Sequence, residues 1–554
     1  MTETSLPRLT AGLAAAFALS VLGVFPLYID RFSNLGVVKY TGGFTLCLLF
    51  SLALASCAAV GGRTVPGRWQ RARRDLTLWG LVGFAVTGVL STVASLSPRA
   101  SLWGLSGYYG GLTLVLYTAA AYAVLRSFFE VRDLDLLWLG TGVASTLVTV
   151  LYVLNIFNID LIGAYNKTAV VERAQFFSTL GQKNFNGGFF AVVLPLVFYA
   201  FLSARGRVRS IVYGGPAILG TLALVVVDAE GLALGLGAAV LVLVCHRDFT
   251  TRTLRRMALL GAAFFGWAGW MYQMRRSVYT QGGTALLASL GAPAIAVTGA
   301  VLCLVLWAAL RFALGGKETP LYKPARALTA LLLGSSVVLV VLANLWPGFP
   351  SLGERLDGLL VFNDDWGTYR GTAWRIAWGT WADGSLWRKL VGVGPGMMHD
   401  AVAAWAGDGL TDRMATFYAA HNEYLEQLLT TGLLGLAAWL MFVISHLRRG
   451  FRQWDRPGVA PVLLALCSYL AEAVVSIRVS MIFPLVMVLF ALLAALTAPE
   501  LPRPAAVTRP GTRKKPAESE TSSPVVHTAK VVATAVGGMV LSAVLSPILF
   551  GFLF

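Results

Sequence analysis

The sequence is dominated by about fifteen apolar runs, most of them close to the length needed to cross a bilayer, separated by short polar loops. Such runs favour α-helices, because a helix satisfies its own backbone hydrogen bonds where no water is present. Hydrophobic residues make up 57% of the chain, and charged residues make up only 13%. We therefore predict an all-α integral membrane protein with about 14–15 transmembrane helices.

Lysine and arginine gather in alternate loops, and positively charged loops stay in the cytoplasm. The alternation is regular only if residues 211–245 form two short spans that turn at 228–231. It places the N-terminus inside and the 347–424 segment outside. Arg275 and Arg276 then lie on the outer side, where they either reach the lipid interface or contact a phosphate. The net charge of +17 fits anchoring to anionic membrane lipids better than binding of nucleic acid.

The chain divides by composition into five predicted parts. These are an N-terminal transmembrane bundle at 1–346, a mainly helical extracytoplasmic loop at 347–424, a C-terminal transmembrane bundle at 425–497, a flexible basic cytoplasmic linker at 498–529 and a last transmembrane helix at 530–554. The loop is rich in arginine and tryptophan, so chemistry on an anionic, lipid-borne substrate is expected there. Nucleotide-binding and HExxH metal motifs are absent from the sequence, and we expect no cofactor and no metal.

A polar run at 178–187 follows Arg173 and opens the apolar run that ends near Ser203. The backbone N–H groups of a helix N-terminus suit an anion, and Lys183 adds a positive charge. The alternative is an ordinary helix start, with Asn184 or Asn186 as its cap.

Within the predicted outer loop, Arg370, Trp374 and Trp378 are spaced by four residues and share one helical face. A guanidinium forms forked bonds with phosphate oxygens, and aromatic faces beside it suit a sugar. Arg375 is a second candidate. The alternative is an amphipathic helix that lies on the membrane with a belt of tryptophans.

His421 stands where the polar loop meets the next apolar run, with Glu423 and Glu426 close in sequence. An imidazole there could accept a proton near neutral pH, and a carboxylate could orient it. The alternative is a structural histidine, which is the more frequent role of a lone histidine.

Four segments, in this order along the chain, resemble the bacterial O-antigen ligase and O-antigen polymerase superfamily. The similarity covers roughly residues 81–496. The segments are Leu96, Ser97 and Pro98 through Gly111; Arg173 through Asn186; Arg370 with Trp374 and the turn Gly392, Gly394 and Gly396; and His421, Asn422 and Leu425 followed by Thr431, Gly432, Leu433, Leu434 and Gly435.

The resemblance implies a glycosyltransferase of the bacterial cytoplasmic membrane. Such enzymes move a glycan, with inversion, from an undecaprenyl-pyrophosphate carrier to a sugar, lipid or protein hydroxyl, without a nucleotide sugar or a required metal. A polymerase that joins two carrier-linked units uses the same chemistry. A transporter or flippase of lipid-linked glycans is the alternative without catalysis, and should carry charges along several spans.

The resemblance also implies roles for individual residues. His421 acts as the base, and Arg370 and Arg173 bind the pyrophosphate. Substrate binding extends to Arg375, Lys183, Asn186, Trp374, Glu423, Arg275 and Arg276.

One departure from the family concerns the turn between the two central short spans. The family carries Ser-Arg-Gly there, whereas this chain has Asp228, Ala229, Glu230 and Gly231. One pyrophosphate-binding arginine is therefore expected to be missing, or to be supplied by Arg173, Arg275 or Arg276.

Overall fold

The computed structural model describes residues 5–61, 75–104, 107–166, 173, 175–277, 290–313, 317–409, 411–498 and 524–551. It is 79% helix, and its described residues form no strand. Ten helices in these ranges are long and apolar enough to cross a membrane, and four shorter apolar helices accompany them. The all-α class is confirmed. Several of the predicted 14–15 spans are helices shorter than a full crossing.

The helices of the first half are α1 (Ser5–Leu19), α2 (Leu35–Gly61), α3 (Leu76–Val93), α4 (Pro98–Trp103), α5 (Leu112–Phe128), α6 (Leu134–Ile156), α7 (Lys183–Ser203), α8 (Arg207–Val227), α9 (Glu230–Val244) and α10 (Thr251–Ser277). The second half contains α12 (Pro293–Phe312), α13 (Tyr322–Leu345), α14 (Glu354–Leu360), α15 (Trp366–Ala382), α16 (Leu386–Val391), α17 (Met398–Ala406), α18 (Asp412–Ala415), α19 (Glu423–Arg452), α20 (Val459–Glu472), α21 (Phe483–Leu496) and α22 (Pro524–Phe550). The predicted break within 211–245 is confirmed, since α8 and α9 are separate helices with Asp228 in a left-handed conformation between them.

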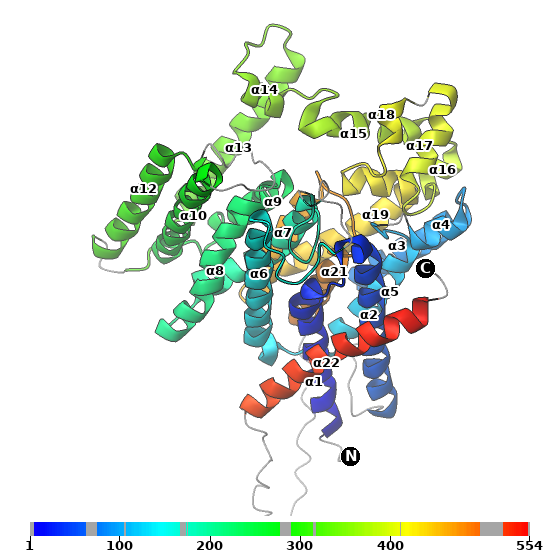
Figure 1. Ribbon diagram of the computed structural model, residues 1–554, viewed down its shortest axis with the longest axis horizontal. Helices are drawn as coiled ribbons and strands as arrows, with labels where there is room; N and C mark the ends of the chain where they lie inside the picture. The colour runs from blue at the N-terminus through cyan, green and yellow to red at the C-terminus, as the bar shows by residue number, and fades with distance from the viewer. Residues whose placement is uncertain are drawn as a thin grey trace, which may run out of the picture.

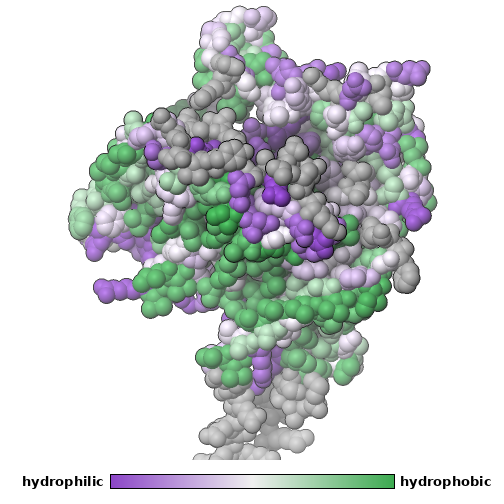
Figure 2. All heavy atoms as spheres, in the orientation of Figure 1, coloured by the Kyte–Doolittle hydropathy of each residue, from purple (hydrophilic) through white to green (hydrophobic). Residues whose placement is uncertain are grey.

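Helices α7 and α21 form the centre of the bundle. Every residue of α21 is buried, and α7 is buried over most of its length, as expected for helices that are hydrophobic on all sides. By contrast, α12 and α13 stand at the edge, in green in Figure 1, and almost none of their residues is buried. Figure 2 shows hydrophobic residues gathered across the middle of the molecule.

The polar segment 347–424 folds into α14–α18, which lie above one end of the bundle (Figure 1). It has a small apolar core that includes Ile376, Met398 and Val402, and Leu429 of α19 is part of the same core. The Asn344 side chain at the end of α13 donates to the carbonyl of Leu360 in α14 at 2.7 Å. The segment is therefore continuous with the helices beneath it.

The last helix, α22, crosses α1 and α2, as the red ribbon in Figure 1 shows. The hydroxyl of Ser20, directly after α1, donates to the Ala535 carbonyl at 3.1 Å, and the Ser542 hydroxyl donates to the Gly42 carbonyl at 2.7 Å. The helix begins at Pro524, inside the predicted linker 498–529, of which residues 499–523 lie outside the described residues.

Helices α3 and α19 pack at very close range because a glycine lies at their contact. A Cβ atom added at Gly80 would lie 2.6 Å from the backbone nitrogen of Phe442. Small residues of this kind let the backbones of membrane helices approach each other. A substitution at Gly80 therefore tests how closely α3 packs on α19.

Gly80→Ala should push α3 away from α19 and destabilise the protein by about 1–3 kcal/mol, the usual cost of overpacking. Gly237→Ala is the matched control, because a Cβ atom at Gly237 would have no neighbour within 4 Å. Thermal unfolding in detergent measures both variants. Equal melting temperatures for the two variants would contradict the packing of α3 on α19.

Candidate functional site

A small pocket brings Arg370 and His421 together, and we call it the Arg–His pocket. The start of α7 with the residue before it, the start of α9, and residues 475–477 between α20 and α21 supply most of the other walls. Its remaining lining residues are Gln182, Asn184, Phe185, Ala229, Gly231, Leu232, Glu472, Val475, Ser476 and Ile477. Segments far apart in the sequence thus meet at the end of the bundle that carries α15.

His421 lies in the loop just before α19, in a left-handed conformation with a φ of 49°. The helix is capped by Asn422, whose side-chain oxygen accepts from the backbone nitrogens of Tyr424 at 3.0 Å and Leu425 at 3.1 Å. Burial and the positive charge of Arg370 both lower the pKa of His421 from its usual value. The imidazole is therefore neutral at pH 7 and can accept a proton.

Arg370 is held by three hydrogen bonds that leave part of its guanidinium available. Its Nε donates to the carbonyl of Val475 at 3.1 Å, and its Nη1 donates to the carbonyl of Gly367 at 2.8 Å and to the Glu230 carboxylate at 2.9 Å. Nη2 donates to no group within the described part of the chain. Arg370 directly follows a left-handed stretch that includes Thr368 and Tyr369. The regular part of α15 therefore begins at the arginine.

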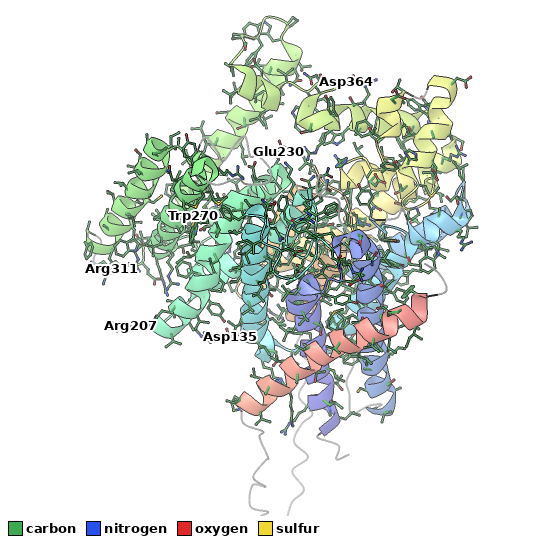
Figure 3. The ribbon with its side chains drawn as sticks, viewed as in Figure 1. Asp135, Arg207, Glu230, Trp270, Arg311 and Asp364 are labelled. Carbon is green, nitrogen blue, oxygen red and sulfur yellow. The ribbon has the colours of Figure 1, made fainter. Side chains whose placement is uncertain are left out.

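Glu230 occupies the place where the family resemblance led us to expect an arginine. Its side chain is 67% exposed, whereas that of Arg370 is only 13% exposed. Figure 3 labels Glu230 at the end of the bundle below α15. An exposed carboxylate that pairs with a shielded guanidinium occupies one donor of Arg370 and can be displaced by another anion.

Two candidates on α15 have partners outside the Arg–His pocket. Arg375 forms a forked ion pair with Asp364, with both nitrogen–oxygen distances at 2.9 Å, and both side chains are exposed. Trp374 packs against the rings of Phe362 and Trp366, with centroids 5.6 and 5.2 Å away. Neither residue lines the pocket.

The candidates before α7 and in its first turn differ in their surroundings. Arg173 places its guanidinium over the ring of Tyr165 at 5.4 Å, and its buried Nε has no hydrogen-bond partner among the residues that the structure describes. Lys183 is exposed at the first turn of α7, between two residues that line the pocket. Asn186 is fully buried, and its Nδ2 donates to backbone carbonyls of its own loop, the shortest bond being 2.9 Å to Gly181. The geometry of Asn186 is that of a residue that holds the loop.

Arg275 and Arg276, at the end of α10, are only partly described. Arg275 lies close enough to Asp228 for its charge, like that of Lys183, to lower the pKa of that carboxyl. Burial is the larger effect, so the pKa of Asp228 remains raised. The side chain of Arg276 lies outside the described residues.

The sequence analysis missed Arg478, which lies between α20 and α21. Its side chain is 5% exposed, and its Nε donates to Oε1 of Glu423 at 2.8 Å. The guanidinium also lies over the rings of Phe483 at 4.2 Å and Trp439 at 4.7 Å. The available signal was a single arginine between two apolar runs, since charges within membrane-spanning regions are functional candidates.

Glu423 and Glu426 have partners other than the imidazole of His421. Glu423 accepts from Arg478 and from the hydroxyl of Tyr469, and Glu426 accepts from the backbone nitrogen of Ala420 at 2.7 Å. The structure therefore gives neither carboxylate the expected hydrogen bond to His421.

Comparison with models of protein families found no family that matches this chain, and a search of curated proteins found no match.

Glu230→Gln should strengthen the binding of a pyrophosphate to Arg370, because it removes the carboxylate that competes for the guanidinium. Exposed ion pairs contribute about 0.2–1 kcal/mol, so the dissociation constant should fall by a factor of up to about five. Calorimetric titration with inorganic pyrophosphate measures it. Asp364→Asn is the control, since Asp364 pairs with Arg375 outside the pocket. If Glu230→Gln bound pyrophosphate more weakly than the wild-type protein, pyrophosphate would not displace the Glu230 carboxylate from Arg370.

Proposed function

We propose that the chain is a glycosyltransferase that moves a glycan from undecaprenyl pyrophosphate to an acceptor hydroxyl, as an O-antigen-ligase-like enzyme. The observation that carries this proposal is the meeting of Arg370 and His421 in one pocket at the polar end of a bundle of apolar helices. A lipid carrier can reach such a pocket from the side of the bundle, and the pocket combines an anion-binding group with a proton acceptor.

In the proposed reaction, the acceptor oxygen attacks the anomeric carbon of the donor sugar, and a ring nitrogen of His421 takes the hydroxyl proton. The new carbon–oxygen bond forms as the bond to the pyrophosphate breaks, and the electron pair stays on the pyrophosphate. Arg370 offsets the negative charge that develops there. The products are the inverted glycoside and undecaprenyl pyrophosphate, and His421 then releases its proton to water.

The distribution of charge supports an orientation with the Arg–His pocket on the outer face of the bacterial cytoplasmic membrane. Arg126 and Arg449 pair with Asp75 at the N-terminal end of α3 and the C-terminal end of α19, which is the far end of α19 from His421. Basic residues stay on the cytoplasmic side, so the proposed pocket faces outward. Nucleotide sugars of the cytosol could not reach it.

The placement of two buried charges favours an enzyme over a flippase. Glu472 and Arg478 are buried charges in or beside the central helices, and both lie at the pocket end of the bundle. A flippase should have charged groups along several spans at mid-depth. Ligase and polymerase share the proposed chemistry and differ in their acceptors.

His421→Ala and Arg370→Ala should each reduce transfer by about 100-fold or more, because each removes a group that acts in the transition state. The assay incubates purified protein with undecaprenyl-pyrophosphate glycan and a panel of acceptors, without added metal, and measures the gain of acceptor mass. Arg388→Ala is the control, an exposed arginine of α16 outside the pocket. Wild-type turnover in both pocket variants would refute the assignment.

The dependence of the rate on pH should follow the neutral form of His421. Because burial and Arg370 lower its pKa, the base form persists to lower pH than for an ordinary histidine. The value of kcat/KM should therefore be flat near neutrality and fall only below about pH 6.5, the usual histidine pKa. An acidic limb centred above pH 7 would exclude His421 as the base.

A further inference from the structure

A cavity of about 210 Å³ lies between α7, α8, α9 and α10, and we call it the α7–α10 cavity. The Arg–His pocket uses the first turns of α7 and α9, whereas this cavity is lined by their later turns, including Leu202 near the end of α7 and Leu243 near the end of α9. The two sites therefore lie toward opposite ends of these helices.

The lining of the α7–α10 cavity is almost entirely hydrocarbon. Its two hydroxyl groups already have acceptors, since Tyr199 donates to Asp248 at 3.2 Å and Thr221 donates to the Ile218 carbonyl at 2.6 Å. A buried water needs polar partners, whereas an apolar cavity of about 150 Å³ stays dry and can bind benzene. The α7–α10 cavity is larger than that, so a hydrocarbon is the ligand that suits it.

The cavity opens between α9 and α10. Helix α10 packs mainly on α12 and α8, while α9 packs mainly on α20 and α7. Val240 of α9 lines the cavity and is nevertheless 41% exposed, which places it at the opening. Because these helices lie within the apolar bundle, a lipid chain can enter the cavity sideways from the bilayer.

Arg256 of α10 stands at one end of the cavity. It is one helical turn before Leu260, which lines the cavity, so the two residues share a face of α10. Its Nη1 donates to the carbonyls of Phe201 and Leu202 at the end of α7. Its Nη2 donates to the Ser210 hydroxyl of α8 at 2.7 Å. The guanidinium therefore joins three of the helices that form the cavity. This is the end of α8 at which Figure 3 labels Arg207.

The arginines at this end exceed the carboxylates that could neutralise them. Arg252 and Arg255 lie close enough to Arg256 for their positive charges to repel it. Glu318 pairs with Arg252 at 2.9 Å, and within the described part of the chain no carboxylate forms an ion pair with Arg255 or Arg256. The Nε of Arg256 also donates to no group among the described residues. A bound anion would offset this repulsion.

We propose that the α7–α10 cavity binds one acyl chain of an anionic phospholipid whose phosphate lies at Arg256. A dry hydrocarbon cavity beside an uncompensated guanidinium matches the two parts of such a lipid. A zwitterionic lipid would bring an ammonium group to the same arginines, so the anionic class is favoured. In the orientation proposed above, this end of the bundle is cytoplasmic, and the lipid comes from the inner leaflet. The inference does not depend on the proposed glycosyl transfer.

Native mass spectrometry of the delipidated full chain in detergent measures the binding of phosphatidylglycerol and phosphatidylethanolamine with identical acyl chains. The wild-type protein should prefer phosphatidylglycerol by about tenfold, as expected for hydrogen bonds between charged groups. Arg256→Gln should remove this preference. Arg209→Gln is the matched control, because Arg209 is an exposed arginine of the same end that has its own partner, Asp135, at 2.6 Å.

A second variant tests the hydrocarbon part of the site. Val240→Trp should fill the opening and weaken the binding of both lipids by about tenfold, since the acyl chain loses its place in the cavity. Leu234→Trp is the control, because Leu234 is an exposed residue of the same helix outside the cavity. Val240 lies at the surface, so its variant should fold and decides the matter even if Arg256→Gln does not fold.

Three results would overturn the proposal. The first is equal binding of the two lipids by the wild-type protein, and the second is wild-type binding by Val240→Trp. The third is displacement of phosphatidylglycerol by undecaprenyl phosphate at equal concentration, which would assign the cavity to the carrier chain. The assay measures lipid binding without turnover, so its failure leaves the proposed glycosyltransferase standing, and a lack of transfer activity leaves the lipid site standing.

Discussion

The buried ion pair between Glu423 and Arg478 is the interaction on which the candidate site depends. Both side chains are almost completely removed from solvent, and aromatic rings surround the guanidinium. Removal of one partner from such a pair leaves an uncompensated buried charge at a cost of about 3–5 kcal/mol. The pair joins the first turn of α19 to the linker before α21. His421 is two residues before Glu423, and Ile477 is one residue before Arg478. The ion pair therefore helps to bring His421 and Ile477 into the same pocket.

The linker between α20 and α21 organises the rest of the site. Its Ala473 carbonyl accepts from the backbone nitrogen of Glu423 at 2.8 Å, and its Val475 carbonyl accepts from Arg370 at 3.1 Å. Farther along, the backbone nitrogen of Ser480 donates to the Tyr108 carbonyl at 3.1 Å. One linker thus holds residues of α15, of α19 and of the loop before α5. The polar segment supplies both Arg370 and His421, and the helices beneath it supply the other walls of the pocket.

The sequence identified the two residues that meet in the Arg–His pocket, and it misjudged several of their neighbours. Helical spacing put Arg370 and Trp374 on one face, yet only the arginine lines the pocket. Trp374 packs instead against rings of the preceding segment. Arg478 escaped notice because apolar residues surround it in the sequence. The charge that neutralises it lies 55 residues away, on a different helix.

Local patterns were sufficient to establish the helical class, the break between α8 and α9, and the polar segment above the bundle. Helix formation depends on neighbouring residues and on the length of an apolar run, and both can be read along the chain. The partners of the charged groups were decided only by the tertiary structure. Arg370 pairs with Glu230, 140 residues away, because packing brings the start of α9 beneath α15. Electrostatic and hydrogen-bond partners depend on distances between helix ends, which no local pattern encodes.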